Sequence, residues 1–153
     1  MNDHYPSLKD FRLPAYEDIP DVGLYLDQVV KYINGFFTEF EDLQITPSML
    51  TNYVKKKLVP KVKRKTYSRD QISRFFFIAM AKTVLSMDNI RLCLDSWQLS
   101  EDDFEKRYSY FREHLLKALS GDEEAIEEPM VRNVTMAIVH KLKLEEYFRS
   151  LQV

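Results

Sequence analysis

The sequence predicts a mainly α-helical protein, and three observations support this fold class. The chain of 153 residues contains only three Gly, and no stretch shows the alternation of apolar and polar residues that is typical of a half-buried strand. Its hydrophobic content of 45% is enough to bury a core in one compact unit. Residues of types that cap helices precede apolar patterns of helical period at four places: Thr46, Ser68, Ser86 and Ser100.

Residues 1–20 are predicted to form an extended arm. They contain three of the six prolines and no helical period, so we expect Phe11 and Tyr16 to pack the arm onto the rest of the protein. A support helix is predicted from Asp21 to about Phe40. Its apolar side is made by residues at helical spacing: Val22, Leu26, Val29, Val30, Ile33 and Phe37. The acidic residues 39–42 follow, and we expect them to lie near the basic residues described below.

A short helix is predicted from Pro47 to Lys56. Thr46 can accept a hydrogen bond at its start, and Pro47 suits the first helical position because no backbone donor is needed there. One side of this helix is apolar and is predicted to pack: Leu50, Tyr53 and Val54. Four polar residues lie within an arc of about 100° on the other side, where they can contact a partner: Ser48, Thr51, Asn52 and Lys55.

Residues 61–67 are too short and too charged for a buried element, and they lie between Pro60 and the helix cap at Ser68. We expect a small basic hairpin or loop. Ser68 and Gln71 have the spacing of a capping box, which predicts that a core helix starts here. Its apolar residues recur every three or four positions: Ile72, Phe75, Phe76, Ala79, Met80 and Val84. Ser86 is predicted to cap a further helix that carries Ile90 and Leu94, followed by a connector at residues 95–99.

The last part of the chain, residues 96–153, is predicted to be an antiparallel pair of helices that packs as one unit with residues 21–95. Ser100 begins the first helix of the pair, and Gly121 supplies a left-handed stop. Its apolar residues are Phe104, Tyr108, Phe111, Leu115 and Leu119. Pro129 begins the second helix after an acidic turn. Its predicted inward residues are Val131, Val134, Ile138, Leu142 and Tyr147.

Charge is divided unevenly along the chain. The net charge of the whole is −2, yet residues 53–74 contain nine Lys or Arg and one acidic residue, a net charge of +8. The remainder therefore has a net charge of −10. Because a local basic patch attracts phosphate whatever the global charge, an overall acidic protein can still bind nucleic acid.

The order of short helix, basic wing, core helix and Ser-capped helix resembles the winged helix-turn-helix of MerR-type transcription regulators. The matching residues are mainly apolar: Leu50, Tyr53, Leu58, Val59, Pro60, Tyr67, Ser68, Ile72, Ile78, Leu85, Ser86 and Ile90. The sequence departs from this family at Lys57, where a helix-ending Gly is usual, and the short first helix is missing. The final helices are too short and too aromatic for the long dimerising coiled coil of MerR-type proteins, so a homodimer remains an alternative to a monomer.

Taken whole, the chain also resembles an uncharacterised bacterial family, domain-of-unknown-function family 1836. Residues 13–20 and a helix around residues 24–28 carry this second resemblance. It implies a source and a fold but no activity.

The winged motif and the basic stretch together predict a DNA-binding regulator of transcription that reads double-stranded DNA. Base edges would be read by Ser48, Thr51, Asn52 and Lys55. Phosphates would be held by Lys56, Lys61, Lys63, Arg64, Lys65 and Arg69. Runs of Lys are more often a solvated surface, so the alternative is a non-enzymatic protein-interaction module whose basic wing meets an acidic partner.

Other classes find little support in the sequence. Cys93 is the single cysteine and the three His are scattered, so no disulfide framework and no zinc-ligand spacing is present. No catalytic residues, metal or cofactor are expected, and we expect no enzyme. Without a signal peptide or an apolar run of membrane length, a cytoplasmic protein is the simplest expectation. Cys93 is expected to be an inert apolar residue, and Phe75, Phe76 and Phe77 are expected in the core rather than around a ligand.

Overall fold

The computed structural model describes residues 8, 11–61, 63–98, 104–122 and 126–152. These residues are mainly helical and contain no strand, which confirms the predicted class. The α-helices are α1 (Leu26–Phe36), α2 (Pro47–Lys55), α3 (Arg69–Ala81), α4 (Met87–Gln98), α5 (Phe104–Leu119) and α6 (Pro129–Ser150). Short 3-10 helices lie at η2 (Tyr16–Asp18) and η3 (Glu41–Leu43). Isolated antiparallel bridges join Leu24 to Tyr67 and Lys63 to Thr66.

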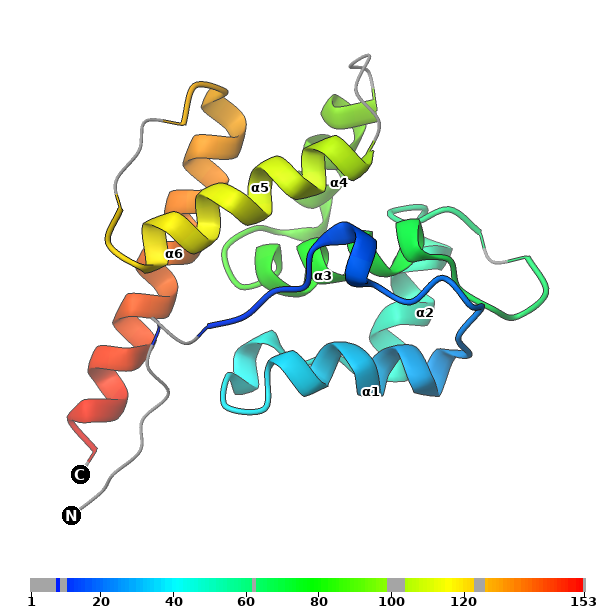
Figure 1. Ribbon diagram of the computed structural model, residues 1–153, viewed down its shortest axis with the longest axis horizontal. Helices are drawn as coiled ribbons and strands as arrows, with labels where there is room; N and C mark the ends of the chain where they lie inside the picture. The colour runs from blue at the N-terminus through cyan, green and yellow to red at the C-terminus, as the bar shows by residue number, and fades with distance from the viewer. Residues whose placement is uncertain (1–7, 9–10, 62, 99–103, 123–125, 153) are drawn as a thin grey trace.

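Helix α3 is the centre of the protein, with α1 on one side and α5 on the other (Figure 1). Every residue from Gln71 to Ala81 is buried. Three consecutive phenylalanines reach three different neighbours, because successive side chains on a helix point about 100° apart. The ring centroids are 5.6 Å apart for Phe75 and Tyr67, 5.4 Å for Phe76 and Phe36, and 5.1 Å for Phe77 and Phe111. The predicted core role of these aromatics is confirmed.

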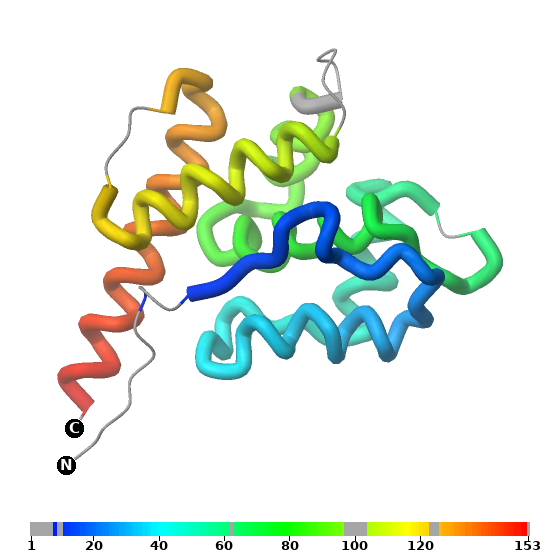
Figure 2. Tube along the Cα trace, in the orientation of Figure 1, coloured from blue at the N-terminus to red at the C-terminus, as the bar shows by residue number. Residues whose placement is uncertain are grey.

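The described part of the N-terminal arm packs onto the body as predicted, with Phe11 buried. It crosses in front of α3 from the α5 side to the loop that follows α2 (Figure 2). Four hydrogen bonds mark its course. They are Arg112 Nε to the Leu13 carbonyl at 2.7 Å, Tyr108 Oη to the Pro14 carbonyl at 2.7 Å, Arg69 Nε to the Ile19 carbonyl at 2.7 Å and Tyr67 N to the Leu24 carbonyl at 2.9 Å.

The predicted start of the support helix at Asp21 is wrong, because α1 begins only at Leu26. Gly23 has a φ of +79°, a left-handed conformation that interrupts a helix, and Leu24 pairs with Tyr67 instead. Val22 is consequently 82% exposed rather than part of the apolar side. The Asp21 carboxylate accepts a hydrogen bond from the backbone N of Arg69 at 2.9 Å, so it caps α3 rather than α1.

The acidic residues 39–42 do not approach the basic loop. Helix α1 carries the chain to the opposite end of the molecule (Figure 1), where these residues contact α3 and α6. Arg149 Nη1 donates to the Glu39 carbonyl at 3.1 Å, and Lys82 Nζ donates to the Asp42 carbonyl. The chain then returns to α2 past Asn34, whose side-chain amide makes two hydrogen bonds to the backbone of Ile45 at 2.8 and 2.9 Å.

Two predictions about the C-terminal part are wrong. Residues 95–98 are not a connector, since α4 continues to Gln98. Helices α5 and α6 pack together, but Figure 1 shows their axes crossing rather than running side by side in opposite directions. The segment between them, residues 120–128, is longer than the loop of a helical hairpin, and Ile126 within it is buried in the core.

The buried sides of α5 and α6 and the end of α5 otherwise follow the prediction. The apolar residues of α5 are buried, and Gly121 ends that helix with a φ of +90°. The inward residues of α6 are buried except Tyr147, which is 58% exposed. The predicted cap at residues 100–103 lies outside the described residues. No helix in the described ranges has the length and hydropathy that crossing a membrane requires.

Candidate nucleic-acid interface

Helix α2 presents its polar side to solvent. Thr46 Oγ1 accepts from the backbone N of Met49 at 3.1 Å and Pro47 is the first helical residue, as predicted. Leu50 and Tyr53 are buried on the opposite side, and burying a side chain of this size contributes about 1.5–3 kcal/mol. That anchoring fixes which side faces outward. Of the predicted base-reading residues, Ser48, Thr51 and Lys55 are exposed and Asn52 is half-buried.

The chain leaves α2 through a tight left-handed turn at Lys57. Its φ is +64°, and the turn has the two hydrogen bonds of a Schellman motif: Lys57 N to the Val54 carbonyl at 3.0 Å and Leu58 N to the Tyr53 carbonyl at 2.9 Å. For a residue with a Cβ, this conformation is less favourable than a right-handed one by roughly 1–2 kcal/mol. Leu58 and Val59 are buried directly after the turn, so the backbone is fixed before the exposed residues begin.

We call residues 56–66 the basic loop. Near its tip, Lys63 pairs with Thr66 across Arg64 and Lys65, both of which have a φ of +63°. Two consecutive residues with positive φ form a type I′ turn, which Asn-Gly adopts most easily. Cations occupy both positions here. All the predicted phosphate-binding residues of this loop are exposed: Lys56, Lys61, Lys63, Arg64 and Lys65.

Two hollows border the basic loop. One of about 470 Å³ lies against the end of α2 and is lined by Val54, Lys55 and residues 57–61. The other, of about 410 Å³, lies between the loop, the arm and the start of α3, with Asp21, Lys63 and Asp70 among its lining residues. Cations of the loop line both hollows, Lys57 and Lys61 the first and Lys61 and Lys63 the second, where a bound molecule can reach them.

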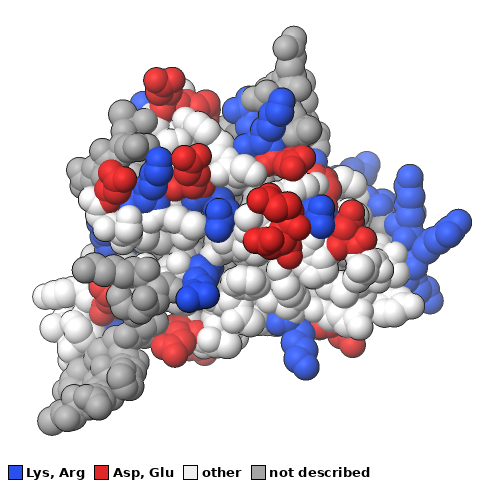
Figure 3. Space-filling view, viewed as in Figure 1, with Lys and Arg blue, Asp and Glu red and all other residues white. Residues whose placement is uncertain are grey.

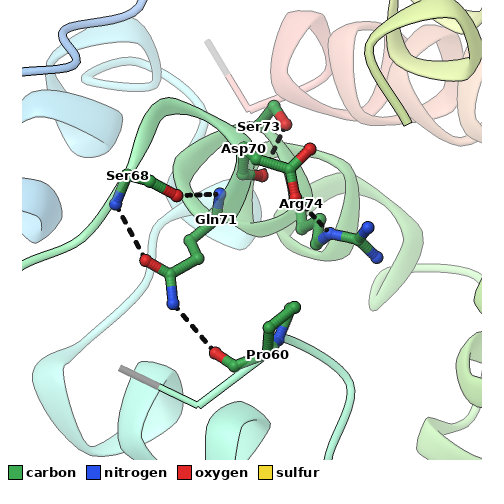
Figure 4. Close-up of polar contacts among 6 residues, drawn as sticks. All are labelled: Pro60, Ser68, Asp70, Gln71, Ser73 and Arg74. Carbon is green, nitrogen blue, oxygen red and sulfur yellow. Dashed lines mark hydrogen bonds and ion pairs between the residues drawn. The ribbon is translucent and has the colours of Figure 1, made fainter. Parts of the chain in front are cut away.

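Gln71 ties Pro60, within the basic loop, to Ser68, which follows the loop at the start of α3 (Figure 4). Ser68 Oγ accepts from Gln71 N at 3.2 Å, and Gln71 Oε1 accepts from Ser68 N at 2.8 Å, which confirms the predicted capping box. Gln71 Nε2 also donates to the Pro60 carbonyl at 2.9 Å. Tyr67 is buried beneath the loop, and this burial raises the pKa of its hydroxyl above the usual value. It is therefore a support for the loop and does not stack on a partner.

The two arginines of α3 are held by structural contacts. Arg69, predicted as a phosphate ligand, donates from Nε to the Ile19 carbonyl and lies over the Tyr16 ring with its guanidinium carbon 5.8 Å from the centroid. Arg74 donates from Nε to Asp70 Oδ2 at 3.0 Å and lies over the Phe104 ring at 4.3 Å. The arm, which sequence patterns did not place beside α3, supplies both the carbonyl and the ring that hold Arg69.

Arg91 is a candidate contact residue that the sequence did not single out. It is exposed on α4, and its Nη2 donates to the Lys56 carbonyl at 2.7 Å, 35 positions earlier in the chain. A cation at the C-terminal end of α2 is favoured by the helix dipole. Met49 is a second such residue, 37% exposed among the polar residues of α2. Its exposure could be predicted from the helical angle, whereas the position of Arg91 depends on the fold.

Lys and Arg side chains project from the edge of the molecule where Figure 1 has α2 and the basic loop (Figure 3). On the face shown, the acidic side chains lie further back from that edge. Such an arrangement attracts a polyanion at one end of a protein that is acidic overall. Within the described residues, no three His, Cys, Asp or Glu side chains gather as metal ligands would.

A family model described as "Domain of unknown function (DUF1836)" matches residues 14–114. The matched range contains α1 to α4, the basic loop, most of α5 and the part of the arm that crosses α3. Neither a curated protein nor a solved structure matches the chain. The description of the family names no activity, so function has to be argued from the site.

Proposed function

The chain belongs to the DUF1836 family, and from the geometry of its own residues we propose that it is a non-enzymatic regulator of transcription that binds duplex DNA. In this proposal α2 and α3 with the basic loop form a MerR-like winged helix-turn-helix. One observation carries the proposal. The exposed polar residues of α2 are followed by the basic loop, whose tip has a cation at each of two consecutive left-handed positions, Arg64 and Lys65.

The proposed complex has α2 in the major groove. An α-helix with its side chains is about 10–12 Å in diameter, which fits the major groove of about 12 Å, and the nine residues of α2 extend about 13 Å along it. Asn52 can bond an adenine edge through both atoms of its amide, and the methyl group of Thr51 can contact a thymine methyl. Ser48 near the N-terminus and Lys55 near the C-terminus of α2 extend the set along the groove.

The basic loop supplies the phosphate contacts. Five of the predicted phosphate-binding cations remain once Arg69 is assigned to structure, and all are exposed: Lys56, Lys61, Lys63, Arg64 and Lys65. If each neutralises one phosphate, the logarithm of the binding constant should fall with the logarithm of the salt concentration at a slope of about −4.5 per protomer. The strained turn supports this role, because unfavourable backbone conformations concentrate at functional positions.

The proposal is tested by selecting bound fragments from random duplex DNA and titrating the enriched sequence at roughly 50 mM salt. We expect an enriched motif whose affinity exceeds that of scrambled DNA and whose salt slope is near the value above. A titration that shows no binding to the random pool or to a pool of genomic fragments at this salt concentration would reject it.

A second candidate is a protein-interaction module on the same scaffold. The hollow of about 470 Å³ favours it, because Val54, Leu58, Val59 and Pro60 line it beside lysines. This lining suits a peptide with apolar and acidic side chains. Recovery of a protein partner after nuclease treatment, together with no enriched motif in the DNA selection, would favour this reading over the first.

A further inference from the structure

Four large apolar side chains are exposed together on the last turns of α6. Leu144 is 50% exposed, Tyr147 58%, Phe148 51% and Leu151 63%. Single exposed apolar residues are normal, whereas the largest contiguous apolar patch on a protein is often functional. We call these four residues the α6 patch.

The α6 patch lies on a helix that is firmly held from its other side. Leu142 is buried, and Arg149 lies over the Phe40 ring with its guanidinium carbon 5.4 Å from the centroid. Leu144, Tyr147 and Leu151 recur every three or four residues, so they form one stripe along the outer side. The last turns of α6 extend from the body at the end opposite the basic loop (Figure 1). The patch is therefore a preformed surface.

We propose that the α6 patch binds a second copy of this chain. Its four residues follow the pattern Leu-x-x-Tyr-Phe-x-x-Leu, which is symmetric about its midpoint in the kind of side chain: leucines at both ends and aromatic residues at both central positions. A two-fold axis at that midpoint would set two antiparallel α6 helices so that Leu144 meets Leu151 of the second copy and Tyr147 meets Phe148. Interfaces with two-fold symmetry need such self-complementarity, because both copies use the same surface.

A hollow beside the patch suits the side chain that this pairing brings to it. It has a volume of about 240 Å³ and is lined by Phe148, Arg149 and residues 39–43, among others. Tyr147 of the second copy, opposite Phe148, would place its ring at this hollow. Its hydroxyl would then lie near the acidic residues Glu39 and Glu41, which can accept its hydrogen bond.

The size of the patch predicts a weak association. Four large side chains at about half exposure present on the order of 400 Å². One partner in a standard interface contributes about 800 Å². The pairing should therefore form in concentrated solution and dissociate on dilution.

Sedimentation velocity of the full chain without DNA tests the proposal, over roughly a hundredfold concentration range that approaches the millimolar region. We expect the average mass to rise from monomer toward dimer, and Tyr147→Asp to abolish the rise. Leu92→Asp is the matched control, since Leu92 is 66% exposed on α4, away from the patch. It should associate like the parent. Circular dichroism should show that both variants are folded.

Parent chains that stay monomeric throughout, as expected if another protein or a lipid surface covers the patch, would overturn the proposal. So would equal association of Tyr147→Asp and the parent. The register has its own test. Tyr147→Lys and Phe148→Glu chains should each associate poorly but form a mixed dimer, because the new charges face each other across the axis; absence of that mixed dimer would refute the antiparallel pairing.

Discussion

Asn52 and the pair Lys63 and Arg64 make different kinds of contact in the proposed complex. Contacts to phosphate add affinity on any DNA sequence, whereas contacts to base edges add it only on the right one. Asn52→Ala should therefore lose about 1–3 kcal/mol on the selected site and leave binding to scrambled DNA nearly unchanged. Changing Lys63 and Arg64 together to Ala should weaken binding to the selected site and to scrambled DNA alike. It should also reduce the magnitude of the slope of the logarithm of the binding constant against the logarithm of the salt concentration by about 2.

Fluorescence anisotropy on selected and scrambled duplexes measures both effects, and circular dichroism checks the fold of each variant. If the Asn52→Ala protein discriminates the two duplexes as well as the parent does, then α2 does not read the bases.

Lys57 and Gly121 occupy the same position in two Schellman turns. Gly121 N bonds the Ala118 carbonyl at 3.2 Å and Asp122 N bonds the Lys117 carbonyl at 2.9 Å, the pattern found at Lys57. Only the residue type differs. Lys57→Gly removes an unfavourable left-handed side chain and should raise the free energy of unfolding by about 1 kcal/mol.

Gly121→Ala is the matched opposite. A Cβ at Gly121 would meet nothing within 4 Å, so the backbone conformation alone should lower the free energy of unfolding by about 1 kcal/mol. Urea denaturation measures both variants. Changes of the same sign would show that the φ angle is not what limits stability at these turns.

Cys93 should behave as an apolar core residue. It is 5% exposed, and burial, with a smaller effect from the charge of Glu128, raises the pKa of its thiol to about 12. Since the thiolate is the reactive form, we expect it to react with a disulfide reagent at neutral pH only after denaturant is added. Rapid labelling of the native protein would contradict this.

The same pKa shift has a consequence for stability. In the unfolded chain the thiol ionises as the pH rises above its ordinary pKa of 9.0. In the folded protein the raised pKa keeps the thiol protonated to a higher pH. The contribution of Cys93 to stability is therefore complete below pH 9 and declines as the pH rises from there toward 12.

At the scale of one element, the tip of the basic loop has cations at two positions whose left-handed backbone conformation is unfavourable for them. Changing Arg64 to Asn together with Lys65 to Gly gives the turn its preferred residues and should raise the free energy of unfolding by about 1 kcal/mol. The same change removes two cations and should weaken DNA binding. Changing both residues to Gln is the control, because it removes the charges but leaves the turn strained. If both double variants are equally stable, the strain assigned to this turn is not real.

The elements that the sequence predicted well are those whose signals are local. The caps at Thr46, Ser68 and Ser86 each act within three residues, and hydrogen bonds to Met49 N, Gln71 N and Asn89 N confirm them. A local signal also predicted the left-handed residue Gly121. For the same reason, the exposed side of α2 and the basic loop could be identified as a candidate site before the fold was known.

The elements that the sequence mispredicted depend on distant partners. Asp21 is a good helix cap, but the helix it caps begins 48 residues later, at Arg69. Arg69 donates to the carbonyl of Ile19, 50 positions earlier, a contact that the sequence did not predict. The crossing of α5 and α6 accompanies a connection in which Ile126 is buried in the core. No short-range pattern contains these pairings.

At the scale of the whole molecule, two unlike surfaces lie at opposite ends of the long axis (Figure 1). The basic loop is at one end and the α6 patch at the other. If two copies join through their α6 patches, their basic loops lie at the outer ends of the pair. A site for the pair would then consist of two inverted half-sites separated by a spacer, since the symmetry of the DNA mirrors that of the protein.

The salt dependence of DNA binding should distinguish one bound copy from a pair of copies. One copy on a single half-site should give a logarithmic slope of about −4.5, and two copies on a correctly spaced double site should give about −9. Binding to the double site should be cooperative, because the first copy raises the local concentration of the second. Tyr147→Asp should abolish the cooperativity and leave half-site affinity unchanged, because Tyr147 is far from the DNA in this arrangement. If that variant fills both half-sites as cooperatively as the parent, then bound copies contact each other through some other surface.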